Sequence, residues 1–161
     1  MLNPYNTRRQ GNILFFSTDS GAEYQLYFSD GDGYFPNYPD IAANFFVFGF
    51  ASIGSVKTKQ DPRIRDTVLT AIIDYLSTNK NNGLVYVCDN HGRTDISRNR
   101  LFGRWGKNVE VNISKYDTII NDGDDNPAAY LSLLIHDGCA HYQEMVDAFM
   151  AMNDDLRDKG Y

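Results

Sequence analysis

Apolar residues along this chain form short runs that predict β-strands, and the most informative run lies at residues 84–88. It contains Leu, Val, Tyr, Val and Cys without a polar position, a pattern typical of a strand that is covered on both faces. Residues 45–53 are likewise almost wholly apolar and aromatic and predict a second strand buried on both faces. Residues 13–18 and 23–29, separated by an Asp-Ser-Gly turn, predict a β-hairpin. We therefore expect a sheet with the 84–88 strand at its centre.

Three stretches have the spacing of apolar residues that is typical of α-helices. The first, residues 61–79, begins with an Asp-Pro pair that suits a helix cap and first turn. A second helix is predicted from a cap at Thr94 or Asp95 to residue 105, and a third over residues 141–156. In the first helix, one apolar face is predicted from positions three or four apart: Ile64, Val68, Leu69, Ile72, Tyr75 and Leu76.

The last two strands complete a predicted α+β fold. Val109, Val111 and Ile113 alternate with polar residues and predict a strand that reaches residue 120, and residues 128–135 predict another. The order is βββαβαββα: a single mixed, mostly antiparallel sheet flanked by about three helices. We expect one domain over residues 1–161, with residues 1–11 as a polar lead-in that can fray.

Composition narrows the class of protein. The chain has 161 residues and a net charge of -6, which argues against broad nucleic-acid binding because phosphate neutralisation needs a surplus of Lys and Arg. Two cysteines are too few for a disulfide scaffold, and no leader or long apolar span opens the chain. These features predict a cytoplasmic protein without a membrane partner.

Charge is unevenly distributed along the chain. Residues 91–107 contain four Arg with Lys107 and Asp95, a local charge of +4, whereas residues 108–161 carry a local charge of -8. Guanidinium groups suit carboxylate and phosphate, so the predicted helix after the central strand favours an anionic small molecule or an acidic protein surface. The alternative is that these Arg side chains pair with Asp and Glu of the C-terminal part.

A second cationic stretch surrounds the predicted start of the first helix, where unpaired N–H groups and the helix dipole favour an anion. The alternative is a capped helix with solvated basic residues, because no Gly-rich cradle is present and Pro62 donates no N–H. Neighbouring strands that splay apart would bring both cationic stretches to one site. The candidate ligand-binding residues are Lys57, Lys59, Arg63, Arg65, Asn90, Arg93, Arg98, Arg100 and Arg104.

Five further residues have types that bind zinc, which takes thiolate and imidazole ligands in a tetrahedral shell. The two groups do not repeat one known ligand spacing, and the first cysteine ends an apolar strand, where a small buried thiol is common. We therefore expect no metal site. The five residues are Cys88, His91, His136, Cys139 and His141.

From the hairpin to the strand at 128–135, the order of elements resembles the core of the GCN5-related N-acetyltransferase (GNAT) family. The likeness covers about residues 12–135. It extends to the Asp-Asn pair at 89–90 and to Arg-Asn-Arg-Leu-Phe at 98–102, where that family often has Asn and then a Leu-Tyr pair. The resemblance implies coenzyme A binding at the start of the first helix and transfer of an acyl group to an amine.

Three features depart from the GNAT pattern. The run 60–67 lacks the glycines with which that family binds the coenzyme A pyrophosphate, and Phe102, which has no proton to give, stands where the family often has a Tyr general acid. No Asp or Glu lies in residues 45–56 to act as a base. We therefore expect a protein with the GNAT topology that is not a competent acetyltransferase, and we assign no catalytic residue and no cofactor. The alternative is a divergent N-acyltransferase, whose cofactor would be acyl-coenzyme A.

The chain also resembles a family of small uncharacterised bacterial proteins, through Asp-Pro-Arg at 61–63, Cys-Asp-Asn at 88–90, Gly-Arg at 92–93 and the run 98–102. That likeness implies no activity. The rival to ligand binding is a non-catalytic interaction module, such as an immunity- or antitoxin-like protein or a homodimer subunit. It rests on an aromatic excess that could form an exposed patch: Tyr34, Phe35, Tyr38 and Trp105.

Overall fold

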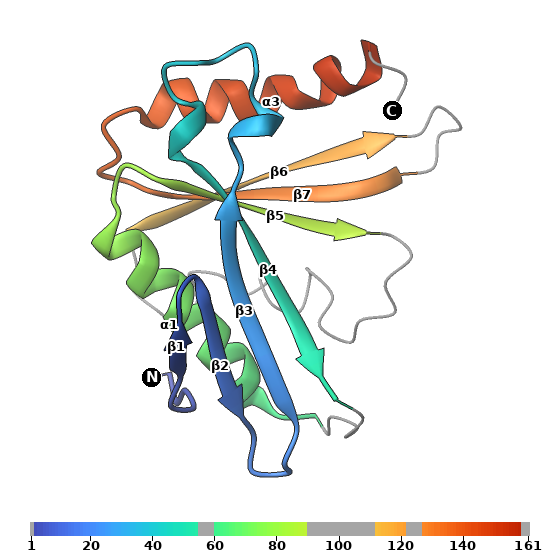
Figure 1. Cartoon of the computed structure of the whole chain (residues 1–161). Helices are drawn as coiled ribbons and strands as arrows, with labels where there is room; N and C mark the ends of the chain where they lie inside the picture. Colours follow the sequence, from blue (N-terminus) through green and yellow to red (C-terminus); the bar gives the residue numbers. More distant parts are fainter. Residues whose placement is uncertain (1, 55–59, 90–111, 122–126, 159–161) are drawn as a thin grey trace.

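The computed structural model describes residues 2–54, 60–89, 112–121 and 127–158 of the chain (Figure 1). One sheet of seven strands contains β1 (Arg8–Gln10), β2 (Ile13–Ser17), β3 (Glu23–Asp30), β4 (Phe45–Ile53), β5 (Gly83–Asp89), β6 (Ile113–Asn121) and β7 (Pro127–His136). Its order is β1-β2-β3-β4-β5-β7-β6. Only β4 and β5 pair in parallel, and every other neighbouring pair is antiparallel. This confirms the predicted α+β class with one mixed, mostly antiparallel sheet.

Two α-helices lie in the described residues, α1 (Pro62–Thr78) and α3 (Tyr142–Asp158), together with two short 3-10 turns, η1 (Asp32–Tyr34) and η2 (Ala42–Asn44). About three helices were expected, and the predicted helix ending at residue 105 lies outside the described residues. Within the part of the chain that the structure describes, no helix is long and apolar enough to cross a membrane.

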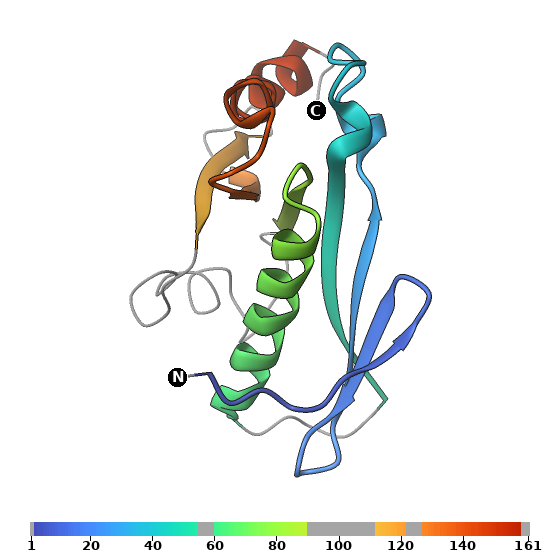
Figure 2. The same ribbon diagram turned by 90° about the vertical axis from the view of Figure 1, so that its left-hand side faces the viewer.

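The two helices cover opposite faces of the sheet and bury two separate cores (Figures 1 and 2). Successive side chains of a strand point to opposite faces, so Leu84 of β5 packs on the α1 side and Val85 on the α3 side. All six predicted apolar positions of α1 lie in or against the α1-side core. The central position predicted for β5 is therefore confirmed, with β4 on one side and β7 on the other.

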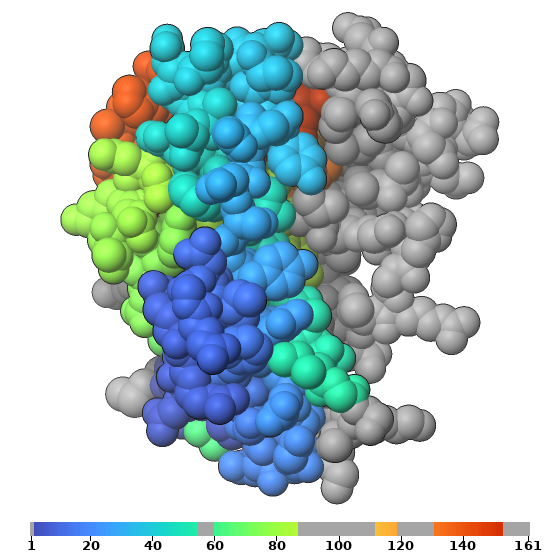
Figure 3. All heavy atoms as spheres, in the orientation of Figure 1, coloured from blue at the N-terminus to red at the C-terminus, as the bar shows by residue number. Residues whose placement is uncertain are grey.

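The strand β4 is less buried than its apolar sequence predicts. Phe45 and Phe48 are buried, but Ser52 and Ile53 are exposed at the other end of the strand. Figure 3 shows β2, β3 and β4 at the surface on the side of the sheet away from α1, without a described helix over them. The expectation of burial on both faces is therefore wrong for the second half of β4, because the α3-side core includes Phe45 but no residue of 49–53.

Residues 1–11 contain more structure than the lead-in predicted for them. Residues 8–10 form β1, which pairs with β2, and the Tyr5 side chain is buried against the α1-side core. We call residues 2–7 the N-terminal strap, because they cross α1 near its start (Figure 2). Tyr5 N–H donates to Thr67 Oγ1 at 2.8 Å and Asn3 N–H to Asp66 Oδ2 at 3.0 Å. The polar N-terminal residues were expected to fray, but they are held in place because α1 supplies hydrogen-bond partners for the backbone of the strap.

Candidate functional site

The strands β4 and β5 pair over only part of their length. Their parallel register begins at Phe45 with Gly83 and ends at Phe48 with Tyr86. Beyond these positions β4 continues to Ile53 and β5 to Asp89 without pairing with each other, and Figure 1 shows the two strands separating. We call this feature the β4/β5 divergence, meaning residues 49–53 and 87–89. Strands that splay were the condition for one site formed from two distant cationic stretches.

The divergence leaves a strand edge that β5 does not use. Antiparallel pairing of β4 with β3 persists to its last residue, where Ile53 is opposite Glu23. The backbone N–H and C=O groups of successive strand residues point alternately to the two sides of the strand. Alternate residues of 49–53 therefore direct their backbone polar groups towards the side from which β5 has departed, where buried groups of this kind need partners.

The helix α1 follows β4 in the chain, and its start lies beside the β2–β3 turn, where Arg63 Nη1 is 3.4 Å from Asp19 Oδ2. Asp61 caps it as predicted: its Oδ1 accepts the Arg63 N–H at 2.9 Å, and Pro62 occupies the first turn. The other carboxylate oxygen of Asp61, Oδ2, accepts the hydroxyl of Tyr5 at 2.5 Å. One carboxylate thus joins the start of α1 to the N-terminal strap.

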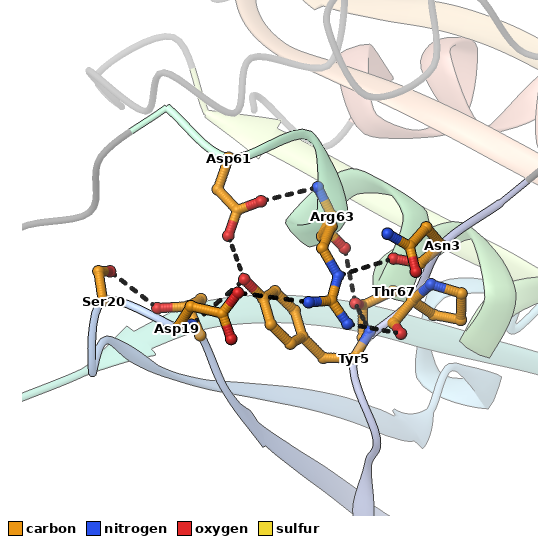
Figure 4. A network of polar contacts seen from close by, with 9 residues as sticks. Asn3, Tyr5, Asp19, Ser20, Asp61, Arg63 and Thr67 are labelled. Carbon is orange, nitrogen blue, oxygen red and sulfur yellow. Dashed lines mark hydrogen bonds and ion pairs between the residues drawn. The ribbon is translucent and has the colours of Figure 1, made fainter.

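Each side-chain nitrogen of Arg63 has a partner, two of them in the strap and one in the β2–β3 turn (Figure 4). Its Nε donates to Asn3 O at 3.1 Å, and its Nη2 to Pro4 O at 3.2 Å. The guanidinium carbon lies 3.8 Å from the centre of the Tyr5 ring, a cation–π contact. Its Nη1 is 3.4 Å from Asp19 Oδ2, and about a third of the side chain remains exposed. Arg63 therefore connects strap, helix and β2–β3 turn, a role that nothing in the local sequence indicates.

Arg65 has an acidic neighbour as well. Its Nη2 lies 3.3 Å from Oδ1 of Asp66, whose other oxygen accepts the Asn3 N–H. Asp66 is buried, whereas the Arg65 side chain is 37% exposed. The partners of both arginines come from the N-terminal half of the chain. The predicted alternative was a capped helix with solvated basic residues; the Asp61 cap is present, but Arg63 and Arg65 lie beside Asp19 and Asp66. The other seven candidates lie outside the described residues: Lys57, Lys59, Asn90, Arg93, Arg98, Arg100 and Arg104.

The Tyr5 hydroxyl is the centre of this polar network, and sequence reasoning missed it. It donates to Asp61 and accepts the Asp19 N–H at 3.2 Å. The hydrogen bond to Asp61, followed by burial of the ring, raises the pKa of Tyr5 above its usual value. A raised pKa means that the native state favours the protonated phenol, so this stabilisation is complete below the unfolded pKa of about 10 and is lost as pH rises through the higher folded value.

We expect Tyr5→Phe to lower the free energy of unfolding by about 1.5–3 kcal/mol at pH 7, because it removes a hydrogen bond to a charged acceptor. Above about pH 10 wild type should lose stability more steeply than the variant. Denaturant unfolding between neutral and alkaline pH measures both effects. Tyr34→Phe is the control, since Tyr34 is 52% exposed and should be neutral at both pH values. Identical pH profiles for wild type and Tyr5→Phe would contradict the role of the phenol.

The residues considered for zinc do not converge where they are described. His136 Nδ1 accepts the Gly138 N–H at 2.9 Å, and His141 Nδ1 lies 3.6 Å from a Glu144 oxygen. Cys139 is buried with its Sγ 3.7 Å from Met145 Sδ, and burial raises the pKa of its thiol. No cluster of three or more His, Cys, Asp or Glu that could hold a metal ion occurs within residues 2–54, 60–89, 112–121 and 127–158. His91 and the Cys88 side chain lie outside that description.

The aromatic patch expected of an interaction module is smaller than predicted. Phe35 is buried, and its ring stacks on Phe45 at 3.7 Å between centroids. Tyr38 is partly buried against the same α3-side core. Tyr34 is exposed, and Trp105 lies outside the described residues. Phe35 is therefore a core residue, because η1 and η2 fold the 31–44 segment back over β4.

Residues 60–151 match a protein-family model that is described as a family of unknown function, DUF6169. The match includes α1, β5, β6 and β7 and ends within α3, whereas β1 to β4 precede it. No curated protein matches the chain. The match agrees with the expectation of a family without an assigned activity, and it does not bear on a bacterial origin or on the acetyltransferase resemblance.

Proposed function

We propose a function for this chain, which belongs to the DUF6169 family: it binds an anionic ligand at the β4/β5 divergence, beside the start of α1. The ligand carries a phosphate or carboxylate group and belongs to a small molecule or to an acidic partner. The observation that carries the proposal is the early end of the parallel pairing, at Phe48 and Tyr86. Two neighbouring parallel strands that separate towards their carboxyl ends are a common setting for a ligand site in sheets.

The edge of β4 that β5 does not use supports a ligand with an extended part. Backbone groups of residues 49–53 that point away from β3 can pair with amide groups of such a ligand, as in the addition of a strand to a sheet edge. This pairing would satisfy polar groups that β5 leaves unpaired. The affinity would then come largely from backbone hydrogen bonds, and a charged end would set the orientation.

The charges near the start of α1 support an anionic end. A helix N-terminus carries about half a unit of positive charge, and Arg63 and Arg65 are 32% and 37% exposed. The Arg63 contact with Asp19 is long, and the Asp19 side chain is 85% exposed. Exposed ion pairs of this kind contribute about 0–1 kcal/mol, so a phosphate group could replace Asp19 at little cost. The cationic residues 91–107 follow β5 directly in the chain and supply the other half of the proposed site.

The order of elements supports an acetyltransferase-like scaffold for this function. The sheet places β7 between β5 and β6, and α1 connects the two strands that pair in parallel. A divergent coenzyme A-dependent N-acyltransferase is therefore the second candidate. Phe102 and the glycine-free run 60–67 favour binding without acyl transfer.

We expect coenzyme A, a nucleotide or sulfate to raise the midpoint of thermal unfolding. Ligand at about a hundred times Kd adds about 2.7 kcal/mol, which corresponds to about 5–10 °C in a domain of this size. Arg65→Gln and Arg100→Gln should each reduce the ligand-induced shift. Lys80→Gln is the matched control, because Lys80 is exposed beyond the other end of α1 and carries the same charge.

The proposal would be contradicted if none of the three ligand classes raised the midpoint of thermal unfolding. It would also be contradicted if Lys80→Gln reduced the ligand-induced shift as much as Arg65→Gln and Arg100→Gln. A turnover measurement distinguishes the second candidate, the acyltransferase, from binding alone. Release of free coenzyme A thiol from acyl-coenzyme A in the presence of an amine would favour the acyltransferase, whereas a thermal shift without thiol release favours binding alone.

A further inference from the structure

A pocket of about 590 Å³ lies between α1, the N-terminal strap and the β1–β2 hairpin. No residue of β4 or β5 lines it, so it is separate from the β4/β5 divergence. Figure 2 shows the strap passing from α1 towards this hairpin. Its size lies within the range of about 300–1,000 Å³ that is usual for pockets that hold drug-sized ligands.

The floor of the pocket is apolar. Leu14, Phe28, Ala71 and Tyr75 line it, and all four belong to or pack against the α1-side core. The rings of Phe28 and Tyr75 stack with centroids 4.5 Å apart and an angle of 5° between their planes. The Tyr75 hydroxyl accepts a hydrogen bond from Asn82 Nδ2 at 3.2 Å, which holds the ring in place. Apolar groups of a ligand would therefore meet a preformed surface.

Two opposite charges line the walls of this pocket, one from the hairpin and one from α1. Arg9 comes from β1 and Asp74 from α1, and neither has an ion-pair partner among the residues that the structure describes. Arg9 pairs in register with Leu14, whereas its neighbour Arg8 pairs with Phe15 and points to the opposite face of the sheet. The walls also contain hydroxyls, including Thr70, which donates to Asp66 O at 2.7 Å and keeps its lone pairs as acceptors.

We propose that this pocket binds a small apolar zwitterion of the size of a di- or tripeptide. The ligand ammonium group pairs with Asp74, its carboxylate with Arg9, and its apolar side chains cover Leu14, Phe28 and Tyr75. A ligand with only negative charge would meet Asp74, and a neutral apolar ligand would take both charges out of water without a partner. Only a molecule with both charges and an apolar middle matches both walls and the floor.

Isothermal titration calorimetry of the full chain with the dipeptide Leu-Phe tests this proposal. We expect saturable binding with a Kd below about 1 mM. N-acetyl-Leu-Phe, which lacks the ammonium group, and Leu-Phe amide, which lacks the carboxylate, should each bind about tenfold more weakly, because each loses one charge-assisted contact. The three probes share the same side chains, so any difference between them reports the charged ends.

Two variants assign each end to one residue. Arg9→Gln should weaken the binding of Leu-Phe about tenfold, and this variant should bind Leu-Phe no more tightly than it binds Leu-Phe amide. Asp74→Asn should weaken the binding of Leu-Phe by the same factor, and this variant should bind Leu-Phe no more tightly than it binds N-acetyl-Leu-Phe. Arg8→Gln is the matched control and should bind like wild type. All three side chains are exposed, so circular dichroism should show unchanged folding. Absence of saturable binding in wild type, or equal weakening by Arg8→Gln, would overturn the proposal.

Discussion

Phe48→Ala is expected to lower the free energy of unfolding by about 3–5 kcal/mol, the usual cost of removing a buried Phe side chain. Phe48 is 1% exposed and lies at the last position where β4 pairs with β5. Its ring contacts Phe28 and Tyr86, with centroids 5.6 and 5.8 Å away. Truncation leaves a cavity on the α1 side at the point where the two strands separate.

Thermal and denaturant unfolding measure this loss, and the midpoint of thermal unfolding should fall by on the order of 10 °C. Tyr34→Ala is the control, because it also removes an aromatic ring but from a side chain that is 52% exposed. Its effect should stay within about 0.5 kcal/mol. Comparable losses in the two variants would mean that Phe48 does not hold the core at this junction.

Asp61→Ala is expected to have the second largest effect, about 3 kcal/mol. The change removes the N-cap of α1, which contributes about 1 kcal/mol, and the acceptor of the Tyr5 hydroxyl, which contributes about 1.5–3 kcal/mol. Loss of the acceptor also frees the strap, because Tyr5 stacks under the Arg63 guanidinium. Asp61→Asn keeps a capping oxygen and should lose less stability than Asp61→Ala.

A double-mutant cycle with Tyr5→Phe isolates the shared contact. Asp61 and Tyr5 should show a coupling free energy of at least about 1 kcal/mol, since each single change removes the same hydrogen bond. Asp40→Ala is the control for loss of an exposed carboxylate and should be near neutral. Additive effects of Asp61→Ala and Tyr5→Phe would contradict a direct contribution of their contact to stability.

Local signals in the chain were enough to predict most strands and helices. Helix α1 was expected over 61–79 and runs from Pro62 to Thr78, because its cap and its apolar spacing act within a few residues of each other. The hairpin of β2 and β3 was predicted for the same reason, since its turn residues and alternation are local. The unbroken apolar run of β5 indicated a central strand because only a strand with cover on both faces tolerates no polar position.

Contacts between distant segments decided the features that matter for a site. Arg63 and Tyr5 lie far apart in the sequence, and neither residue type indicates that a cation–π contact will join them. Phe35 was predicted to belong to an exposed aromatic patch, yet its ring is buried on Phe45. The apolar sequence of β4 predicted cover over its whole length, whereas Ser52 and Ile53 are exposed in the structure.

The sequence by itself determined the class of fold, the position of α1 with its cap, and the central place of β5, because cap chemistry and hydrophobic periodicity act over a few neighbouring residues. Only the tertiary structure decided where β4 leaves β5, which partners hold Arg63 and Arg65, and that Arg9 and Asp74 face one pocket. These features depend on which elements pack together, and packing joins residues whose separation along the chain carries no local signal.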